Sequence, residues 1–268
     1  MHIVLYAETL FHIGPIPITN SFFMMIVVMA LILLVGILAA KRITENPKTG
    51  GRFGATIEFL VGFLLNLVET TGGKKLGRKM FPLVSGLFIF ILFANFSGLL
   101  PGVGSIMVGK DHVPLMRPPT ADLNMTLAMS TTTFLAVQYF GIRAHGVGGR
   151  LKHMADPAFI FPIEVISELS RIISLGARLF GNVFAGEVLL GVGYAIANAV
   201  KIAVVPVLLP VVFIGLEVLF GTIQALVFAL LTLIYIFLAA AGHDDEEPLE
   251  HQEREAHAED GKPALAGD

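Results

Sequence analysis

The sequence contains no cysteine, which excludes a disulfide framework, a thiolate metal site and a cysteine nucleophile. Its histidines are scattered through the termini and loops without the spacing that a metal site requires. Its paired glycines lack the lysine and the serine or threonine of a phosphate-binding loop. No basic and aromatic pattern suggests nucleic acid. We therefore expect no metal, no cofactor, no nucleotide bound by this chain and no nucleic-acid partner.

Charged residues are also scarce. Of the 268 residues, 15% are charged and 55% are hydrophobic, against roughly 25% charged in soluble domains. This composition indicates an integral membrane protein. Ten of the 21 acidic residues lie in residues 242–268, a segment with so few apolar residues that we predict a disordered, acidic tail. Residues 1–241 then form a single membrane domain.

Long apolar runs predict an all-α fold. Residues 1–20 contain no lysine or arginine and so lack a targeting signal. The run at about 21–40 is therefore expected to be a retained first span. Further upright spans are predicted at about 81–101 and 122–142, because about 20 apolar residues cross a bilayer core of ~30 Å.

Three other segments do not fit an upright crossing. Residues from about 53 to 70 carry apolar side chains at helical spacing between basic clusters. This pattern favours an amphipathic helix that lies along the membrane interface; a short span is the competing interpretation. The segments at about 157–198 and 208–241 are too long for one upright helix. We predict that they form a long, steeply inclined helical hairpin.

The distribution of basic residues predicts the orientation. No lysine or arginine precedes the first span, eight lie between residues 41 and 79, and two lie in the loop after the second span. Basic loops stay on the cytoplasmic side. The N-terminus is therefore expected outside and the C-terminus in the cytoplasm.

A polar track runs along the first helix of the predicted hairpin. At about 100° per residue, seven side chains fall within an arc of about 120°: Glu164, Ser167, Glu168, Arg171, Ser174, Arg178 and Asn182. Glu187 is rotated by about 180° from Arg178 and lies off this track.

Arg178 is the residue of the track that most needs a functional reason. A charged side chain at bilayer depth costs at least about 2.5–3.5 kcal/mol, and Arg178 has no acid four residues away in its own helix. Since guanidinium keeps its proton in proteins, it is a fixed cation and not a proton relay. Arg171 differs, because Glu168 and Glu164 are within reach, so a structural or channel-mouth role is expected.

The second helix of the hairpin supplies a matching polar face. Glu217, Gln224 and Tyr235 point within about 20° of one another. Glu187 and Glu217 are then the candidate buried carboxylates for proton exchange, and with Asn182 and Gln224 they indicate a proton pathway. Asp122 and Asn124 form either the mouth of this path or a helix N-cap.

Two other classes of protein are the alternatives, a secondary transporter and a structural scaffold. A secondary ion- or proton-coupled transporter would be expected to show inverted repeats, and the two halves show none. A purely structural scaffold would tolerate the loss of Arg178.

Several motifs resemble subunit a of the F-type ATP synthase membrane sector. The block Arg178-Leu-Phe-Gly-Asn182 with Ala185-Gly-Glu187 is the specific one. Asn95 to Pro101, Pro119 to Asn124 and Gln224 to Phe228 add support, and the likeness covers roughly residues 20–240. The resemblance implies the arrangement of helices predicted above.

The resemblance also implies a role. Such a chain is the stator of a proton-driven rotary motor, pressed against the subunit c ring, beside the peripheral-stalk subunit b. We expect it in a bacterial plasma membrane, although an organelle-encoded copy would look similar. It is no enzyme by itself. Arg178 matches the essential arginine facing the ring carboxylate, and the other candidates match two half-channels: outer, Asn182, Glu187, Glu217 and Gln224; inner, Glu164, Ser167, Arg171 and Ser174. Histidine often replaces Glu217 in relatives.

Overall fold

The computed structural model describes residues 7–45, 51–100, 103, 106–108, 113–154, 161–199 and 205–240. Within these ranges the chain forms α-helices, two short hairpins and one 3-10 turn. The helices are α1 (Asn20–Glu45), α2 (Gly51–Gly72), α3 (Lys74–Ser97), α4 (Leu123–Met154), α5 (Phe161–Ala199) and α6 (Val205–Ala240). The predicted all-α membrane fold is confirmed. The predicted acidic tail, residues 242–268, lies outside the described residues.

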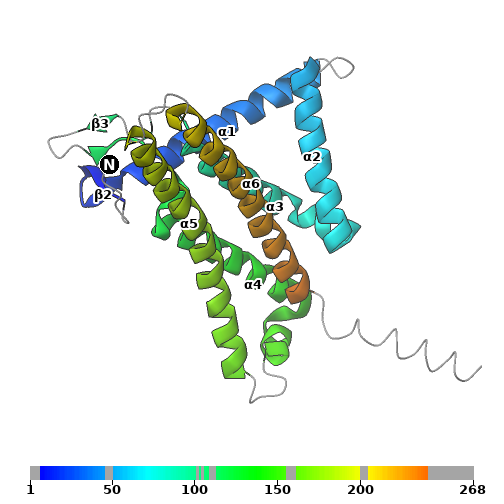
Figure 1. Ribbon diagram of the computed structural model, residues 1–268. Coiled ribbons are helices and arrows are strands. Elements are labelled where there is room, and N and C mark those ends of the chain that lie inside the picture. Colours follow the sequence, from blue (N-terminus) through cyan, green and yellow to red (C-terminus); the bar gives the residue numbers. More distant parts are fainter. Residues whose placement is uncertain are drawn as a thin grey trace, which may run out of the picture.

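The two antiparallel hairpins were not expected. β1 (Thr9–Ile13) pairs with β2 (Ile16–Thr19), and β3 (Met107–Val108) pairs with β4 (Val113–Pro114). They gather at one end of the molecule, close to the end of α5 and the start of α6 (Figure 1). We call this the hairpin end, and we call the end where α4 finishes and α5 begins the opposite end.

The fully buried Asn20 joins α1 to the hairpin end. Its side-chain amide donates to the carbonyl of Pro114 at 3.2 Å, and its side-chain oxygen accepts from the backbone N–H of Ser21 at 2.9 Å. Its own backbone N–H donates to the carbonyl of Glu8 at 3.0 Å. These bonds fix the start of α1 against both hairpins.

α5 and α6 are the longest helices, with 39 and 36 residues. At 1.5 Å per residue they are each more than 50 Å long, well beyond a bilayer core of ~30 Å. They pack side by side along much of their length (Figure 1). This packing places the polar residues of the two helices within reach of each other.

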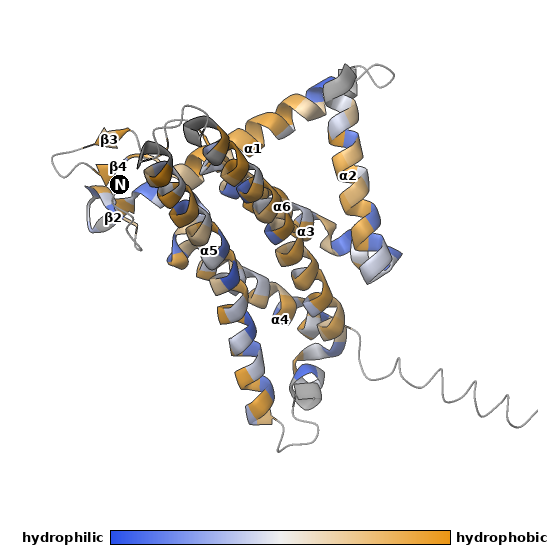
Figure 2. Ribbon diagram, viewed as in Figure 1, coloured by the Kyte–Doolittle hydropathy of each residue, from blue (hydrophilic) through white to orange (hydrophobic). Residues whose placement is uncertain are grey.

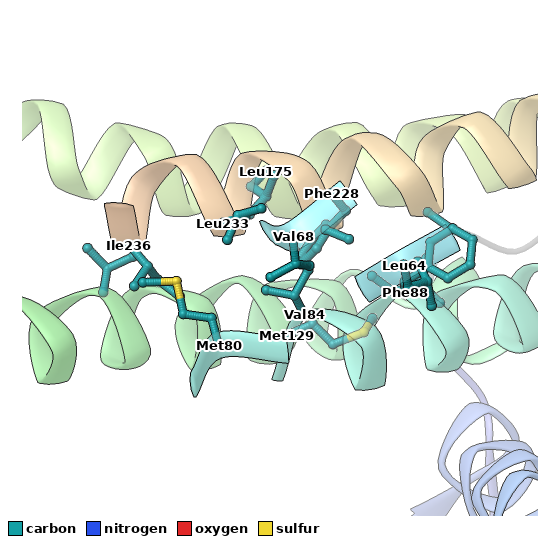
Figure 3. Packing of buried hydrophobic residues seen from close by; sticks show 14 of the residues in the cluster. Leu64, Val68, Met80, Val84, Phe88, Met129, Leu175, Phe228, Leu233 and Ile236 are labelled. Atoms are coloured by element: carbon teal, nitrogen blue, oxygen red, sulfur yellow. The ribbon is translucent and has the colours of Figure 1, made fainter. Parts of the chain in front are cut away.

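The apolar core lies where α2, α3, α4, α5 and α6 meet. Its largest fully buried side chains include Leu64 of α2, Met80 of α3, Leu179 of α5 and Phe228 of α6. Figure 3 shows side chains of this core, among them Leu64, Met80 and Phe228, in the space between the helices, and Figure 2 shows how apolar the ribbons of α1 and α6 are. Large apolar side chains of α1 remain exposed, among them Leu33 at 62%, as expected of a helix in contact with lipid or with another chain.

Among the residues that the structure describes, five helices are long and apolar enough to cross a membrane: α1, α2, α3, α5 and α6. α2, expected along the interface, therefore also meets the criterion for a span, and its position in the bilayer stays a prediction. α4 does not meet that criterion, although a span was predicted at about 122–142. α3 begins earlier than the predicted span at about 81, and α4 continues beyond residue 142.

Candidate functional site

Arg178 lies on the outward face of α5. Its side chain is exposed, and it forms no ion pair with any carboxylate in the described part of the chain. The residues around it on the same exposed face are small: Ser174, Ala177, Gly181 and Ala185. The guanidinium therefore stands on a shallow, apolar surface that another molecule can approach closely.

A cavity of about 210 Å³ opens between α3, α5 and α6 on the hairpin side of Arg178. We call it the asparagine chamber, because Asn95 of α3 and Asn182 of α5 line it together with Glu217 of α6. At about 30 Å³ per molecule of liquid water, it has room for several waters.

The two asparagines bond to adjacent carbonyl groups of α6. The side-chain amide of Asn95 donates to the carbonyl of Gly221 at 2.9 Å, and that of Asn182 donates to the carbonyl of Phe220 at 3.2 Å. Among the described residues, two buried atoms of the chamber lining have no hydrogen-bond partner, Asn95 Oδ1 and Glu217 Oε2. The same holds for Nε2 of Gln224, which is on α6 but does not line the chamber. Buried polar atoms of this kind are normally satisfied by water. The chamber is therefore suited to an internal water chain.

Glu217 reaches the chamber because position 186 has no side chain. A Cβ added to Gly186 would lie 2.9 Å from Glu217 Oε1, so the carboxyl group packs directly on the backbone of α5. Glu187 is not among the residues that line the chamber, but it is close enough to Glu217 for their charges to interact. The two predicted carboxylates thus lie together near the contact of α5 and α6.

Arg117 was not anticipated as a site residue. Its side chain is buried at 7% exposure and its Nη2 donates to the carbonyl of Ala121 at 3.1 Å. It lies within electrostatic range of Glu187. A cation just before the 3-10 turn (Pro119–Ala121) therefore acts on a carboxylate of α5.

Asp122 has the geometry of a helix N-cap. Its Oδ1 accepts the backbone N–H of Asn124 at 3.0 Å, directly at the start of α4, as capping side chains do. Asp122 is buried and Asn124 is exposed. Neither residue lines the asparagine chamber as the described residues define it.

The remaining predicted residues lie on the other side of Arg178, toward the opposite end. Arg171 is 3.8 Å from Glu164 and 3.8 Å from Glu168, and its guanidinium stacks 5.3 Å from the ring centre of Tyr235. Ser167 is partly buried and Ser174 is exposed. The expected proximity of Arg171 to both acids and the meeting of the α5 and α6 polar faces are thus observed.

Glu168 has a closer partner that the sequence did not indicate. Arg150 of α4 lies 2.8 Å from Glu168 Oε1, and both side chains are almost fully buried. Gln138 of α4 donates to the other carboxylate oxygen. The only sequence signal was the glycine-rich stretch 146–149, which marks a break in α4 but not where the chain goes next.

Comparison with known proteins agrees with this geometry. Residues 22–237 match the family model described as ATP synthase A chain. The chain is 39% identical over 235 residues to ATP synthase subunit a of Moorella thermoacetica, covering 87% of this chain and 96% of that protein. It is 36% identical to ATP synthase subunit a of Desulforamulus reducens, covering 82% and 78% of the two chains. It is 34% identical to ATP synthase subunit a 2 of Bradyrhizobium sp., covering 87% and 93%.

The match extends over most of the membrane domain and includes all of the site residues described above. The chain belongs to the ATP synthase A chain family, and it is a multi-pass membrane component of the ATP synthase that takes part in proton transport.

Proposed function

We propose that this chain is the stator of the rotary motor and that Arg178 faces the carboxylates of a subunit c ring. The observation that carries the proposal is the exposed guanidinium of Arg178, which has no carboxylate partner among the described residues and is surrounded by small side chains. A charge at bilayer depth is costly unless it is paired. A carboxylate on a passing ring subunit is the partner that removes this cost.

The mechanism follows from the fixed charge. A cation a few ångströms from a carboxylate in a low-dielectric environment strongly favours the ionised acid. Each protonated ring site that arrives at Arg178 must therefore release its proton. Because guanidinium does not lose its own proton, Arg178 also stops protons from passing directly between the two sides.

Two half-channels supply and remove the protons. The outer one consists of the asparagine chamber, with Asn182 and Glu217, together with Gln224 and Glu187 beside it. Asp122, which also caps α4, and Asn124 do not line the chamber and are assigned to the outer mouth of this path. The inner one contains Glu164, Ser167, Arg171 and Ser174. Since the two meet only at the ring, a proton must ride on the ring to cross. A proton moving down 100 mV releases about 2.3 kcal/mol, which drives rotation.

The proposal also includes the orientation of the chain and its neighbours. The N-terminus and the hairpin end lie outside and the C-terminus lies in the cytoplasm, as the basic residues between 41 and 79 indicate. The chain works beside the peripheral-stalk subunit b and does not itself catalyse the making or breaking of covalent bonds. Nucleotide chemistry takes place in other subunits of the synthase.

The first experiment replaces the cation. Arg178→Ala should abolish ATP-driven proton pumping in inverted vesicles while the assembled complex is recovered in normal amounts. The same vesicles should leak protons faster than the wild type, because the barrier between the half-channels is gone. Normal pumping by Arg178→Ala would refute the proposal.

A second experiment maps the surface. Because the chain has no cysteine, single cysteines can be introduced without a prior cysteine-free background. Ala177→Cys should form a disulfide with a cysteine placed beside the carboxylate of a ring subunit. Leu33→Cys, exposed on α1, is the matched control and should not cross-link. Equal yields at both positions would show that the Arg178 face is not the ring contact.

A further inference from the structure

α4 is kinked at Gly146. This residue has φ 73° and ψ 169°, a backbone conformation that side-chain-bearing residues rarely adopt. Twelve residues of continuous helix separate two Cα atoms by about 18 Å. Arg150 Nε nevertheless donates to Gln138 Oε1 at 3.3 Å. The kink at Gly146 therefore turns residues 147–154 out of the line of the preceding helix, and this arm brings the side chain of Arg150 within reach of Gln138.

The arm delivers Arg150 into a buried site. Arg150 Nη2 is 2.8 Å from Glu168 Oε1, with side-chain exposures of 7% and 6%. Gln138 donates to Glu168 Oε2, so both oxygens of the carboxylate have a partner. The stem of Arg150 rests on Gly141, where an added Cβ would lie 3.1 Å from Nε and 3.2 Å from Cδ. Glu168 is thus held as a buried anion by α4.

Arg171 is the other cation near Glu168, and its situation is different. Its side chain is 40% exposed and lies 3.8 Å from both Glu168 and Glu164. It borders a small pocket of about 20 Å³ together with Glu168, Ser130 and Tyr235. The pocket is small and most of its lining is apolar. It lies beside Arg171, whose two carboxylate contacts are longer than the 2.8 Å contact between Arg150 and Glu168.

We propose that Arg150 is a positioning residue for the inner half-channel. By pairing with Glu168, it leaves Arg171 at 3.8 Å from both acids and at the edge of the small pocket. Without Arg150, the buried carboxylate of Glu168 has Arg171 as its remaining cation among the described residues. Arg171 is then drawn from 3.8 Å into direct contact, which moves its guanidinium into the pocket and narrows the inner path. This inference depends on the proposed function, because it assigns the inner path to this side of Arg178.

The test compares a single and a double substitution. Arg150→Leu leaves Glu168 charged and buried, and ATP-driven proton pumping per assembled complex should fall at least fivefold. Arg150→Leu with Glu168→Leu removes both charges, and pumping should return to within about twofold of the wild type. Removing one member of a buried pair leaves an uncompensated charge, whereas replacing both by apolar residues is often neutral.

The comparison separates positioning from simple packing. If Arg150 only tied the arm to α5, the double variant would break the same tie and pump no better than the single one. That result would overturn the inference. Arg150→Lys keeps the charge and should pump better than Arg150→Leu; equal defects would also count against the inference. Should Arg150→Leu not assemble, Arg150→Gln replaces it in both the single and the double comparison.

Two controls complete the design. Arg143→Leu removes an exposed arginine of the same helix, which bonds the hydroxyl of Tyr139 at 2.8 Å; pumping should stay within about twofold of the wild type. If Arg143→Leu lost as much pumping as Arg150→Leu, removing any arginine of α4 would be enough to impair pumping, and the specific role of Arg150 would be refuted. Failure of the Arg178→Ala test would instead remove the proposed function itself.

Discussion

Gly186→Ala is predicted to impair proton transport by displacing the carboxyl group of Glu217. The new Cβ would lie 2.9 Å from Oε1, 3.0 Å from Cδ and 3.2 Å from Cγ of Glu217. Ordinary contact begins at 3.4 Å, so the carboxyl group must move by about half an ångström. The side chain, not the backbone, takes up this movement, and helix packing is retained.

The size of the effect follows from the distortion of the side chain. An off-rotamer torsion of about 30° costs roughly 0.5–1.5 kcal/mol. At about 1.4 kcal/mol for a tenfold change in rate, proton transport should fall about two- to tenfold if the displaced carboxyl group carries the proton. The assay is ATP-driven quenching of a pH-sensitive dye in inverted vesicles, normalised to assembled complex.

A compensating variant makes this prediction specific. Glu217→Asp shortens the side chain by one methylene group, so Gly186→Ala with Glu217→Asp should transport faster than Gly186→Ala alone. Gly86→Ala is the control, since it adds the same methyl group to an α3 glycine with nothing within 4 Å; it should have no effect. Full activity of Gly186→Ala, or a double variant slower than Gly186→Ala, would refute the reasoning.

The other predictions concern the carboxylates of the outer path and the cap of α4. Glu187→Gln and Glu217→Gln should each slow transport incompletely, because water in the chamber and the second acid partly substitute. A double variant as fast as the wild type would remove both from the path. Asp122→Ala should lower the stability of the solubilised chain by about 1 kcal/mol through loss of the cap, seen as a lower thermal midpoint. Asn124→Ala, whose side chain is exposed, should melt like the wild type, and identical midpoints for both variants would exclude the cap.

Helical periodicity was sufficient to predict the arrangement along α5. Angular spacing alone placed Arg178 and Asn182 on one track with Arg171, and the structure shows these residues in the expected order between the two ends. The same argument gave α6 a polar face that meets α5, as the contact of Tyr235 with Arg171 shows. Such properties depend on neighbours within one helix, which the sequence contains directly.

Contacts between distant segments were not predictable in this way. Asn95 and Gly221 are 126 positions apart, and nothing in either local pattern indicates the other. Arg150 meets Glu168 only because Gly146 turns the chain, and a glycine-rich stretch does not specify the direction of a turn. The helix ends also differed, because hydropathy does not detect the charged first turns of α3, Lys74 to Lys79, which are helical nonetheless.

The interior and the surface of the chain block protons by different means. Along α5, Asn182 and Arg171 are separated by about 16 Å, far more than the ~3 Å of one hydrogen bond. Between them, Leu175 and Leu179 are buried in the hydrophobic cluster with exposures of 3% and 0%. An internal water chain along this stretch of α5 is therefore obstructed by packed leucines. On the outer face the only ionisable side chain of α5 at this level is Arg178, a cation that repels protons and does not release its own. Under the proposed function, a proton that reaches the asparagine chamber continues on an acid that another subunit carries past this face.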